Sequence, residues 1–227
     1  MSPPAPTTPT FSTVKHENMG SQVYLILSLA LIEGRLKPGE RLRIRELAEE
    51  MGTSVTPVRD AILRLVQDGA LIMRSARDIR VKQISLAEYL EIRDIRLELE
   101  GMAAARAAEK ATPTDVERLE QLITENEDAI KQGELITATG LNQRFHFEYC
   151  KIADMPILLD ILRRLWLKMG PLIAEVYSDG GRDMIDGHYA LIDAMRNRDG
   201  QAARIAVQTD ILSGGQAILE LKRRQEL

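Results

Sequence analysis

The sequence predicts a mainly α-helical protein, with a small two-stranded β element near the N-terminus and a bundle of six to seven helices after it. Apolar residues make up 44% of the 227 residues, but aromatic residues only 4%. The core must therefore be built from aliphatic side chains such as Leu, Ile, Ala and Met, and such a composition favours helices. From about residue 85 onward, apolar residues recur at helical spacing and no alternating strand pattern occurs.

Composition and charge divide the chain into three parts. Residues 1–13 carry four prolines and no charged side chain, which indicates a disordered arm. Residues 14–84 hold 12 Lys and Arg against 9 Asp and Glu, a net charge of +3, whereas residues 85–227 hold 18 against 25, a net charge of −7. A basic part on an acidic part would orient the chain toward phosphate, although ordinary charge scatter gives a similar small excess.

Several short elements are predicted in the N-terminal part. Three helices are expected, over residues 21–33, 44–51 and about 55–67. Extended segments are expected over residues 36–42, 71–73 and 79–81. Ser54 or Thr56 caps the third helix, and Pro57 fits its first turn, where a missing N–H costs nothing.

The remainder of the chain is predicted to be helical. Ser85 and Glu88 form a capping-box pattern at the start of its first helix. Further helices are expected over residues 112–133, 135–153, 156–178, 183–197 and 200–222. The pair Gly170-Pro171 predicts a kink in the third of these. Helices in this number and order are typical of a bundle.

The order helix, helix, tight turn at Gly52, helix and two-stranded ribbon is that of a winged helix-turn-helix. In this fold the N-terminal side chains of the third helix face base edges in the major groove. An apolar stripe of Val58, Ile62 and Leu65 would dock this helix on its neighbour. Four residues would then face outward: Ser54, Val55, Thr56 and Arg59.

Arginines accompany these elements. Arg41, Arg43 and Arg45 lie at the start of the second helix, where contacts to DNA phosphates would be natural. Arg74, Arg77 and Arg80 lie on the wing, and Arg77 is expected to contact DNA. Each arginine taken singly also fits a solvated surface charge, so a helical hairpin with solvated arginines is the alternative interpretation.

Three stretches of this region resemble the GntR family of bacterial regulators: Gly34–Leu42, Arg45–Gly52 and Thr56–Leu65. The resemblance implies a regulator that binds double-stranded DNA. It places four residues at DNA-contacting positions of the family: Arg45, Ser54, Thr56 and Arg59. Two positions depart from the family pattern, since Val55 stands where Arg is usual and Ala76 where Gly is usual. The Ala76 methyl group would keep the wing farther from the minor groove.

Residues from about 90 to 222 resemble the FCD ligand-binding domain of the FadR-type branch of this family. The stretches that carry this likeness are Ile92–Glu100, Asn142–His146, His188, Leu191–Met195 and Asp210. Many FCD domains hold a divalent metal with one Asp and three His, and the resemblance places these ligands at Asn142, His146, His188 and Asp210. Here Asn replaces the Asp and Asp replaces one His, so one carboxylate is kept.

The residues themselves support a metal site. Asn142 and His146 are four residues apart, so both face the same way on one helix. Two imidazoles and one carboxylate suit zinc, nickel, manganese or iron. The alternative is a pair of buried, hydrogen-bonded histidines without a metal.

Arg96 lies at the edge of the apolar stripe of its helix. A buried guanidinium needs an anion, which is either Glu100 one turn later or the carboxylate of a ligand. The resemblance favours a ligand, because an arginine at this place helps bind organic acids in related domains. Arg144, Tyr149 and Tyr189 are further candidate neighbours of the ligand.

These observations predict a homodimeric, ligand-responsive repressor that binds a palindromic DNA operator and a small organic acid. Two alternatives remain, a metal-dependent enzyme built on the bundle and a ligand-free DNA-binding protein with a degenerate sensor domain. A single cysteine, Cys150, fits a reducing compartment. No apolar run is long enough to span a bilayer and no signal-peptide pattern is visible, so we expect a cytoplasmic protein without membrane contact.

Val55 generates a prediction about the operator. Valine cannot make the bidentate contact that arginine makes to guanine, although it can touch a thymine methyl group. We therefore expect a binding-site selection to return a half-site that differs from the common one of the family at the base facing residue 55. Recovery of the unaltered common half-site would contradict this expectation.

Overall fold

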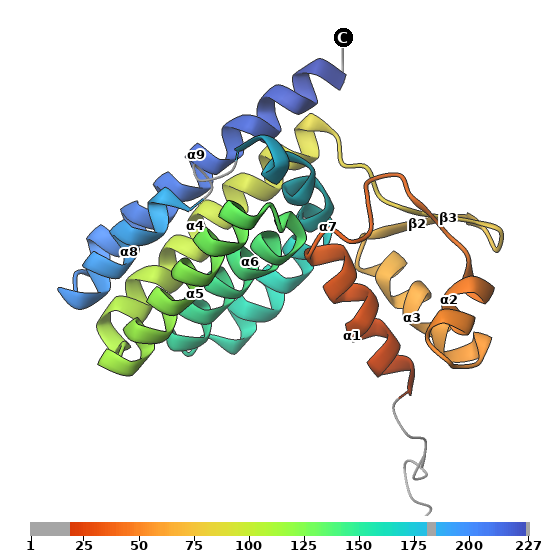
Figure 1. Ribbon diagram of the computed structural model, residues 1–227, viewed down its shortest axis with the longest axis horizontal. Coiled ribbons are helices and arrows are strands. Elements are labelled where there is room, and N and C mark those ends of the chain that lie inside the picture. Colours follow the sequence, from red (N-terminus) through yellow and green to blue (C-terminus); the bar gives the residue numbers. More distant parts are fainter. Residues whose placement is uncertain (1–18, 181–184, 226–227) are drawn as a thin grey trace, which may run out of the picture.

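The computed structural model describes residues 19–180 and 185–225, which form nine helices and three strands. Figure 1 shows a small N-terminal head beside a larger bundle of helices. The predicted disordered arm, residues 1–13, lies outside the described residues. Within the described part of the chain, no helix is both long and apolar enough to cross a membrane.

The head confirms the predicted order of elements and adds one strand. Its elements are α1 (Met19–Ile32), β1 (Arg41–Leu42), α2 (Ile44–Glu50), α3 (Val55–Gln67), β2 (Leu71–Ser75) and β3 (Asp78–Val81). The three strands form an antiparallel sheet in the order β1-β3-β2, so the wing is three-stranded rather than two-stranded. The extended segment before α2 joins the sheet because the buried Leu42 pairs with Ile79.

Helix α3 is fixed in the head by the stripe that the sequence predicts. Val58, Ile62 and Leu65 are all fully buried. At the other end of the helix, the Tyr24 hydroxyl of α1 donates a hydrogen bond to Asp68 at 2.7 Å, and the Arg64 guanidinium lies 4.1 Å from the centre of the Tyr24 ring. These contacts hold α3 against α1, while Ser54, Val55, Thr56 and Arg59 at its N-terminal end stay exposed.

Six helices build the bundle: α4 (Leu86–Lys110), α5 (Pro113–Gln132), α6 (Leu135–Ile152), α7 (Pro156–Gly180), α8 (Asp186–Arg196) and α9 (Gly200–Gln225). The predicted capping box of Ser85 and Glu88 starts α4, and a second box of Thr112 and Asp115 starts α5. Helix α4 is central, since it packs against α6, α7, α8 and α9. Four fully buried alanines let these helices approach it closely: Ala103, Ala104, Ala107 and Ala108.

The head and the bundle meet where α1 packs on α7 (Figure 1). At Gly170 the two backbones approach so closely that a Cβ atom would lie 2.5 Å from the Ile32 Cα atom. Gly34, which has a φ of +72°, lies against Ala174 in the same junction. Pro171 is inside α7, which continues to Gly180. The junction therefore depends on the absence of a side chain at residue 170.

We expect Gly170→Ala to destabilise the protein, because its methyl group would meet backbone atoms of α1 that cannot move independently. The expected loss is about 1–3 kcal/mol in the free energy of unfolding, measured by urea denaturation. Gly20→Ala in α1 is the matched control, since its Cβ would lie an ordinary 3.8 Å from the nearest atom. Equal stability of the two variants would show that the close contact does not constrain the junction.

Candidate functional site

The predicted DNA-reading residues of α3 lie together on the surface of the head. Ser54, Thr56 and Arg59 are exposed, and Val55 has an exposed fraction of 36%. Ser54 is the N-cap residue of α3, and its side chain makes no capping hydrogen bond. All four side chains are therefore available to a ligand that approaches the N-terminal end of α3.

The arginines of the head differ in their partners. Arg45, Arg59 and Arg77 are exposed and form no ion pair with any other residue that the structure describes. Arg41, by contrast, donates two hydrogen bonds from Nε and Nη2 to the Arg77 carbonyl oxygen, at 3.1 and 2.5 Å. Arg43 pairs with Glu46 at 2.5 Å. Arg41 thus holds the turn of the wing, a role that its position in the sequence does not reveal.

The wing turn accommodates Ala76 without strain. Residues 76 and 77 form the turn between β2 and β3. Among the described residues other than glycine, only Asp154 and Arg198 have a positive φ. Glycine is therefore not needed at residue 76 for the backbone of this turn.

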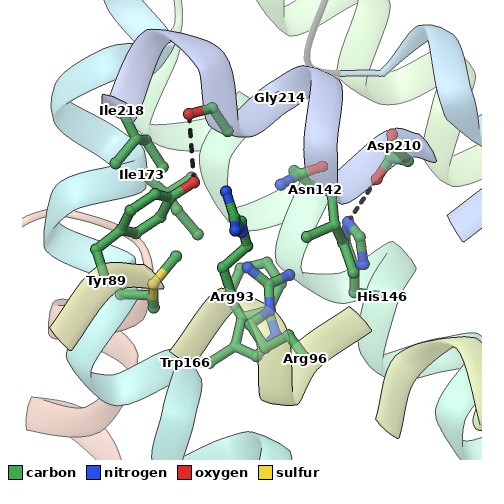
Figure 2. Close-up of a pocket in the computed structure, with 13 residues that line it drawn as sticks. Tyr89, Arg93, Arg96, Asn142, His146, Trp166, Ile173, Asp210, Gly214 and Ile218 are labelled. Carbon is green, nitrogen blue, oxygen red and sulfur yellow. Dashed lines mark hydrogen bonds and ion pairs between the residues drawn. The ribbon is translucent and has the colours of Figure 1, made fainter. Parts of the chain in front are cut away.

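A second candidate site is a cavity of about 30 Å³ inside the bundle, between α4, α6, α7 and α9 (Figure 2). This volume holds about two water molecules and is too small for an organic acid. Four residues that the sequence predicts for the sensor site line this cavity: Arg96, Asn142, His146 and Asp210. The other lining residues were not predicted: Tyr89, Arg93, Trp166, Met169, Ile173, Ile211, Gly214, Gly215 and Ile218.

The fold brings the predicted metal ligands together from three helices. Asn142 and His146 come from α6, His188 from α8 and Asp210 from α9, and all four are buried. The His146 Nε2 atom lies 3.5 Å from Asp210 Oδ2, and the His188 Nε2 atom lies 3.7 Å from Asp210 Oδ1. One ligand atom from each of these three residues falls within 4.8 Å of the others. This spacing is compatible with one shared cation.

Several polar atoms at this point lack a hydrogen-bond partner among the described residues: Asn142 Oδ1, His188 Nδ1, His188 Nε2 and Asp210 Oδ1. Each buried, unsatisfied group of this kind costs about 1–3 kcal/mol. Burial lowers the pKa of His188 well below its usual value, and His146 lowers it further. Burial also raises the pKa of Asp210 to about 6. A cation would satisfy a neutral imidazole, an amide oxygen and a carboxylate at once, so the donor set fits a divalent metal.

A buried carboxylate, Glu100, contacts the candidate metal-binding residues through His146. It accepts hydrogen bonds from Arg96 Nε at 2.5 Å, Tyr149 Oη at 2.8 Å and Trp166 Nε1 at 3.3 Å. His146 Nδ1 lies 2.9 Å from its second oxygen. Burial alone would raise the pKa of Glu100, but Arg96 and His146 outweigh it, and the pKa lies well below its usual value. Glu100 is therefore ionised.

The network around Glu100 defines which nitrogen of His146 carries the proton. Tyr149 gives its single hydroxyl proton to Glu100, and the ionised Glu100 has no proton to give. The His146 Nδ1 atom must then be the donor in this contact, so in a neutral His146 the lone pair is on Nε2, the atom that faces Asp210. A carboxylate at Nδ1 orients metal-binding histidines in the same way.

The sequence offers two partners for Arg96, namely Glu100 and the carboxylate of a ligand. It forms the salt bridge with Glu100 that its spacing allows, and its guanidinium lies over the Trp166 ring at 4.5 Å. It also lines the cavity, as expected of a ligand-binding residue. Of the predicted neighbours, Tyr149 belongs to the Glu100 network, whereas Arg144 and Tyr189 are exposed and do not line the cavity.

The sequence interpretation missed Tyr89, Arg93, Trp166 and the glycine pair on α9. Tyr89 donates a hydrogen bond to the Gly215 carbonyl oxygen at 3.2 Å across the cavity (Figure 2). Residues 89, 93 and 96 share one face of α4, since they are four and three residues apart. Their helical spacing from Arg96 could have predicted Tyr89 and Arg93 as cavity residues. Nothing in the sequence places Trp166 or the glycines at the cavity.

Two family models match parts of this chain. Residues 19–81 match the family model described as bacterial regulatory proteins, gntR family, and residues 91–212 match the FCD domain. The chain therefore belongs to the GntR family of bacterial transcriptional regulators, with the FCD domain of the FadR-type branch.

The chain is similar to the HTH-type transcriptional regulator McbR of Escherichia coli K12, with 35% identity over 84% of this chain and 88% of McbR. The solved structure of E. coli McbR/YncC has a TM-score of 0.84 and covers 92% of this chain and all of that one, at 33% identity. A probable D-xylose utilization operon transcriptional repressor of Paenarthrobacter nicotinovorans is 27% identical over 83% of this chain and 84% of its own length.

The Glu100 network makes a prediction about stability. Glu100→Gln leaves Arg96 as an unpaired buried charge, so we expect a loss of about 3–5 kcal/mol in the free energy of unfolding, measured by urea denaturation. The matched control is Glu46→Gln, since both side chains of the Arg43–Glu46 pair are exposed and its loss should change the stability little. A loss for Glu100→Gln no larger than that of the control would refute the central role of this carboxylate.

Proposed function

We propose that the protein is a ligand-responsive repressor whose bundle binds a small carboxylate, with a divalent metal, and thereby changes how its head binds DNA. One observation carries the proposal. Helix α7 lines the sensor cavity with Trp166, Met169 and Ile173, and the same helix packs on α1 of the head at Gly170. A change in the cavity wall can therefore reach the head through one continuous helix.

On the DNA side, the proposal assigns base contacts to Ser54, Val55, Thr56 and Arg59, which are exposed at the start of α3. Arg45 and Arg77 would contact the phosphate backbone and the neighbouring groove, since both are exposed and neither is engaged in an ion pair with the described residues. One head would bind a short half-site. In a homodimer, the second head would bind the second half-site of a palindrome, because the protein and the palindrome share two-fold symmetry.

On the sensor side, the residues that would hold the metal are Asn142, His146, His188 and Asp210. The unpartnered atoms of Asn142, His188 and Asp210 support this assignment, because a buried polar set without hydrogen bonds is otherwise costly. When bound, zinc, nickel, manganese or iron would supply a positive charge that attracts a carboxylate. Arg96 lines the same cavity and would contribute hydrogen-bond donors to the ligand.

The small size of the cavity supports a response to ligand. A volume of about 30 Å³ does not admit an organic acid, so the effector must select an arrangement with a wider cavity. If that arrangement holds the two heads differently, the effector lowers the affinity for DNA. A tenfold change in DNA affinity requires about 1.4 kcal/mol of differential binding.

Specific observations favour this proposal over its two alternatives. The relatives described above are named as transcriptional regulators or repressors, which favours a regulator over a metal-dependent enzyme. A degenerate, ligand-free bundle would be expected to fill its interior with apolar side chains. Here the interior instead holds His146, His188 and Asp210 close together, and Asn142, His188 and Asp210 carry unpartnered polar atoms.

The proposal is tested with full-length protein and an operator obtained by selection. We expect an equivalent of zinc, nickel or manganese to bind after loading, and a carboxylate from a library to weaken operator binding at least tenfold in fluorescence anisotropy. His188→Ala should lose the metal, whereas Arg59→Gln should lose DNA binding and keep the metal. Less than a tenth of an equivalent of metal would end the metal hypothesis, and no response to any carboxylate would end the sensing hypothesis.

A further inference from the structure

Two arginines of α4 reach the same cavity. Arg93 and Arg96 are three residues apart and both belong to its lining, as Figure 2 shows. Two positive charges in one small cavity repel each other unless anions are near. Their partners therefore decide which arginine remains available to a ligand.

Arg96 is committed to the protein. Its Nε atom donates to Glu100 at 2.5 Å, and the exposed fraction of its side chain is 6%, against 0% for Glu100. Glu100 in turn holds His146, Tyr149 and Trp166. A ligand that displaced Glu100 from Arg96 would leave a buried carboxylate without its counter-charge, which is strongly unfavourable.

Arg93 is held far less firmly. Its partner within the described residues is the adjacent Asp94, whose Oδ1 atom accepts hydrogen bonds from Nη2 at 2.8 Å and from Nε at 3.1 Å. The Asp94 side chain is 64% exposed and the Arg93 side chain 20%. An ion pair with such an exposed partner contributes little, because water solvates the carboxylate nearly as well. A ligand carboxylate can therefore replace Asp94 at small cost.

The charges around the cavity indicate what kind of ligand would do so. Inside the cavity, the two arginines are balanced by the carboxylates of Glu100 and Asp210, which lie in or against its wall. Asp94 is left out of this balance because it does not line the cavity and its charge is largely solvated. A divalent cation at His146 and His188 would then leave two positive charges in the cavity without a counter-charge there. A ligand with two negative charges would neutralise this surplus, whereas a monocarboxylate would neutralise half of it.

We infer that Arg93 is the specificity-determining residue of the sensor and selects effectors with two acidic groups, such as dicarboxylates. One acidic group is held by the metal-binding set together with the Nη atoms of Arg96, whose Nε atom stays on Glu100. The second acidic group displaces Asp94 and is bound by the Arg93 guanidinium. Asn142, which lines the same cavity, offers a further hydrogen-bond donor through its amide NH2 group. This inference rests on the proposed function, since it requires a carboxylate effector.

The test compares acids of equal chain length on zinc-loaded, full-length protein by isothermal titration calorimetry. The pairs are malonate with propionate, succinate with butyrate, and glutarate with valerate. We expect at least one dicarboxylate to bind about tenfold or more tightly than its monocarboxylate partner. Arg93→Gln should weaken that dicarboxylate about tenfold to a hundredfold and change the monocarboxylate by less than about threefold.

Arg106→Gln is the matched control, because Arg106 is an exposed arginine of the same helix that does not line the cavity. Arg93→Lys keeps the charge but not the planar fork, and should retain part of the preference. Unchanged dicarboxylate affinity in Arg93→Gln, or a preference of the wild-type protein for monocarboxylates, would overturn the role of Arg93 alone. Failure of both acid classes to bind the wild-type protein would overturn the carboxylate effector of the proposed function, and this inference with it.

Discussion

The arrangement of the bundle depends on one buried carboxylate. Glu100 on α4 joins Arg96 on its own helix to His146 and Tyr149 on α6 and Trp166 on α7. A buried charge is stable only when several donors satisfy it, so these side chains have little freedom to move apart. The direction of the His146 Nε2 lone pair follows from this contact, and with it the position of the candidate metal site. Glu100 thus supports both the packing of the bundle and the candidate metal site, although in the proposal it contacts neither DNA nor the effector.

A second constraint lies between the head and the bundle. Gly170 lets α7 approach α1 to a distance that no other residue would allow, while Trp166 and Met169 on the same helix face the cavity. Signals between distant sites need an element that both sites touch. In the proposed function α7 is such an element, because it lines the cavity and also contacts the backbone of α1.

In the head, the residues that are proposed to bind DNA differ from the residues that hold α3 in place. The side chains that are proposed to contact DNA, Ser54, Val55, Thr56 and Arg59, are exposed, whereas the stripe of Val58, Ile62 and Leu65 on the same helix is fully buried. Arg41 resembles its neighbouring arginines in sequence but braces the wing turn through the Arg77 carbonyl oxygen. Arginines in similar sequence contexts therefore have different roles, and only their contacts in the folded protein distinguish them.

The sequence by itself determined the order of the helices, the capping box at Ser85, the buried stripe of α3 and the three residues His146, His188 and Asp210 that lie together at the candidate metal site. These features follow from local rules or family likeness, because helical periodicity fixes neighbours three and four residues apart. Only the tertiary structure decided that β1 joins the wing, that Glu100 has partners 46 to 66 residues away, and that the cavity is too small for an organic acid. Contacts between helices depend on how side chains of different sizes pack, and no local pattern encodes that packing.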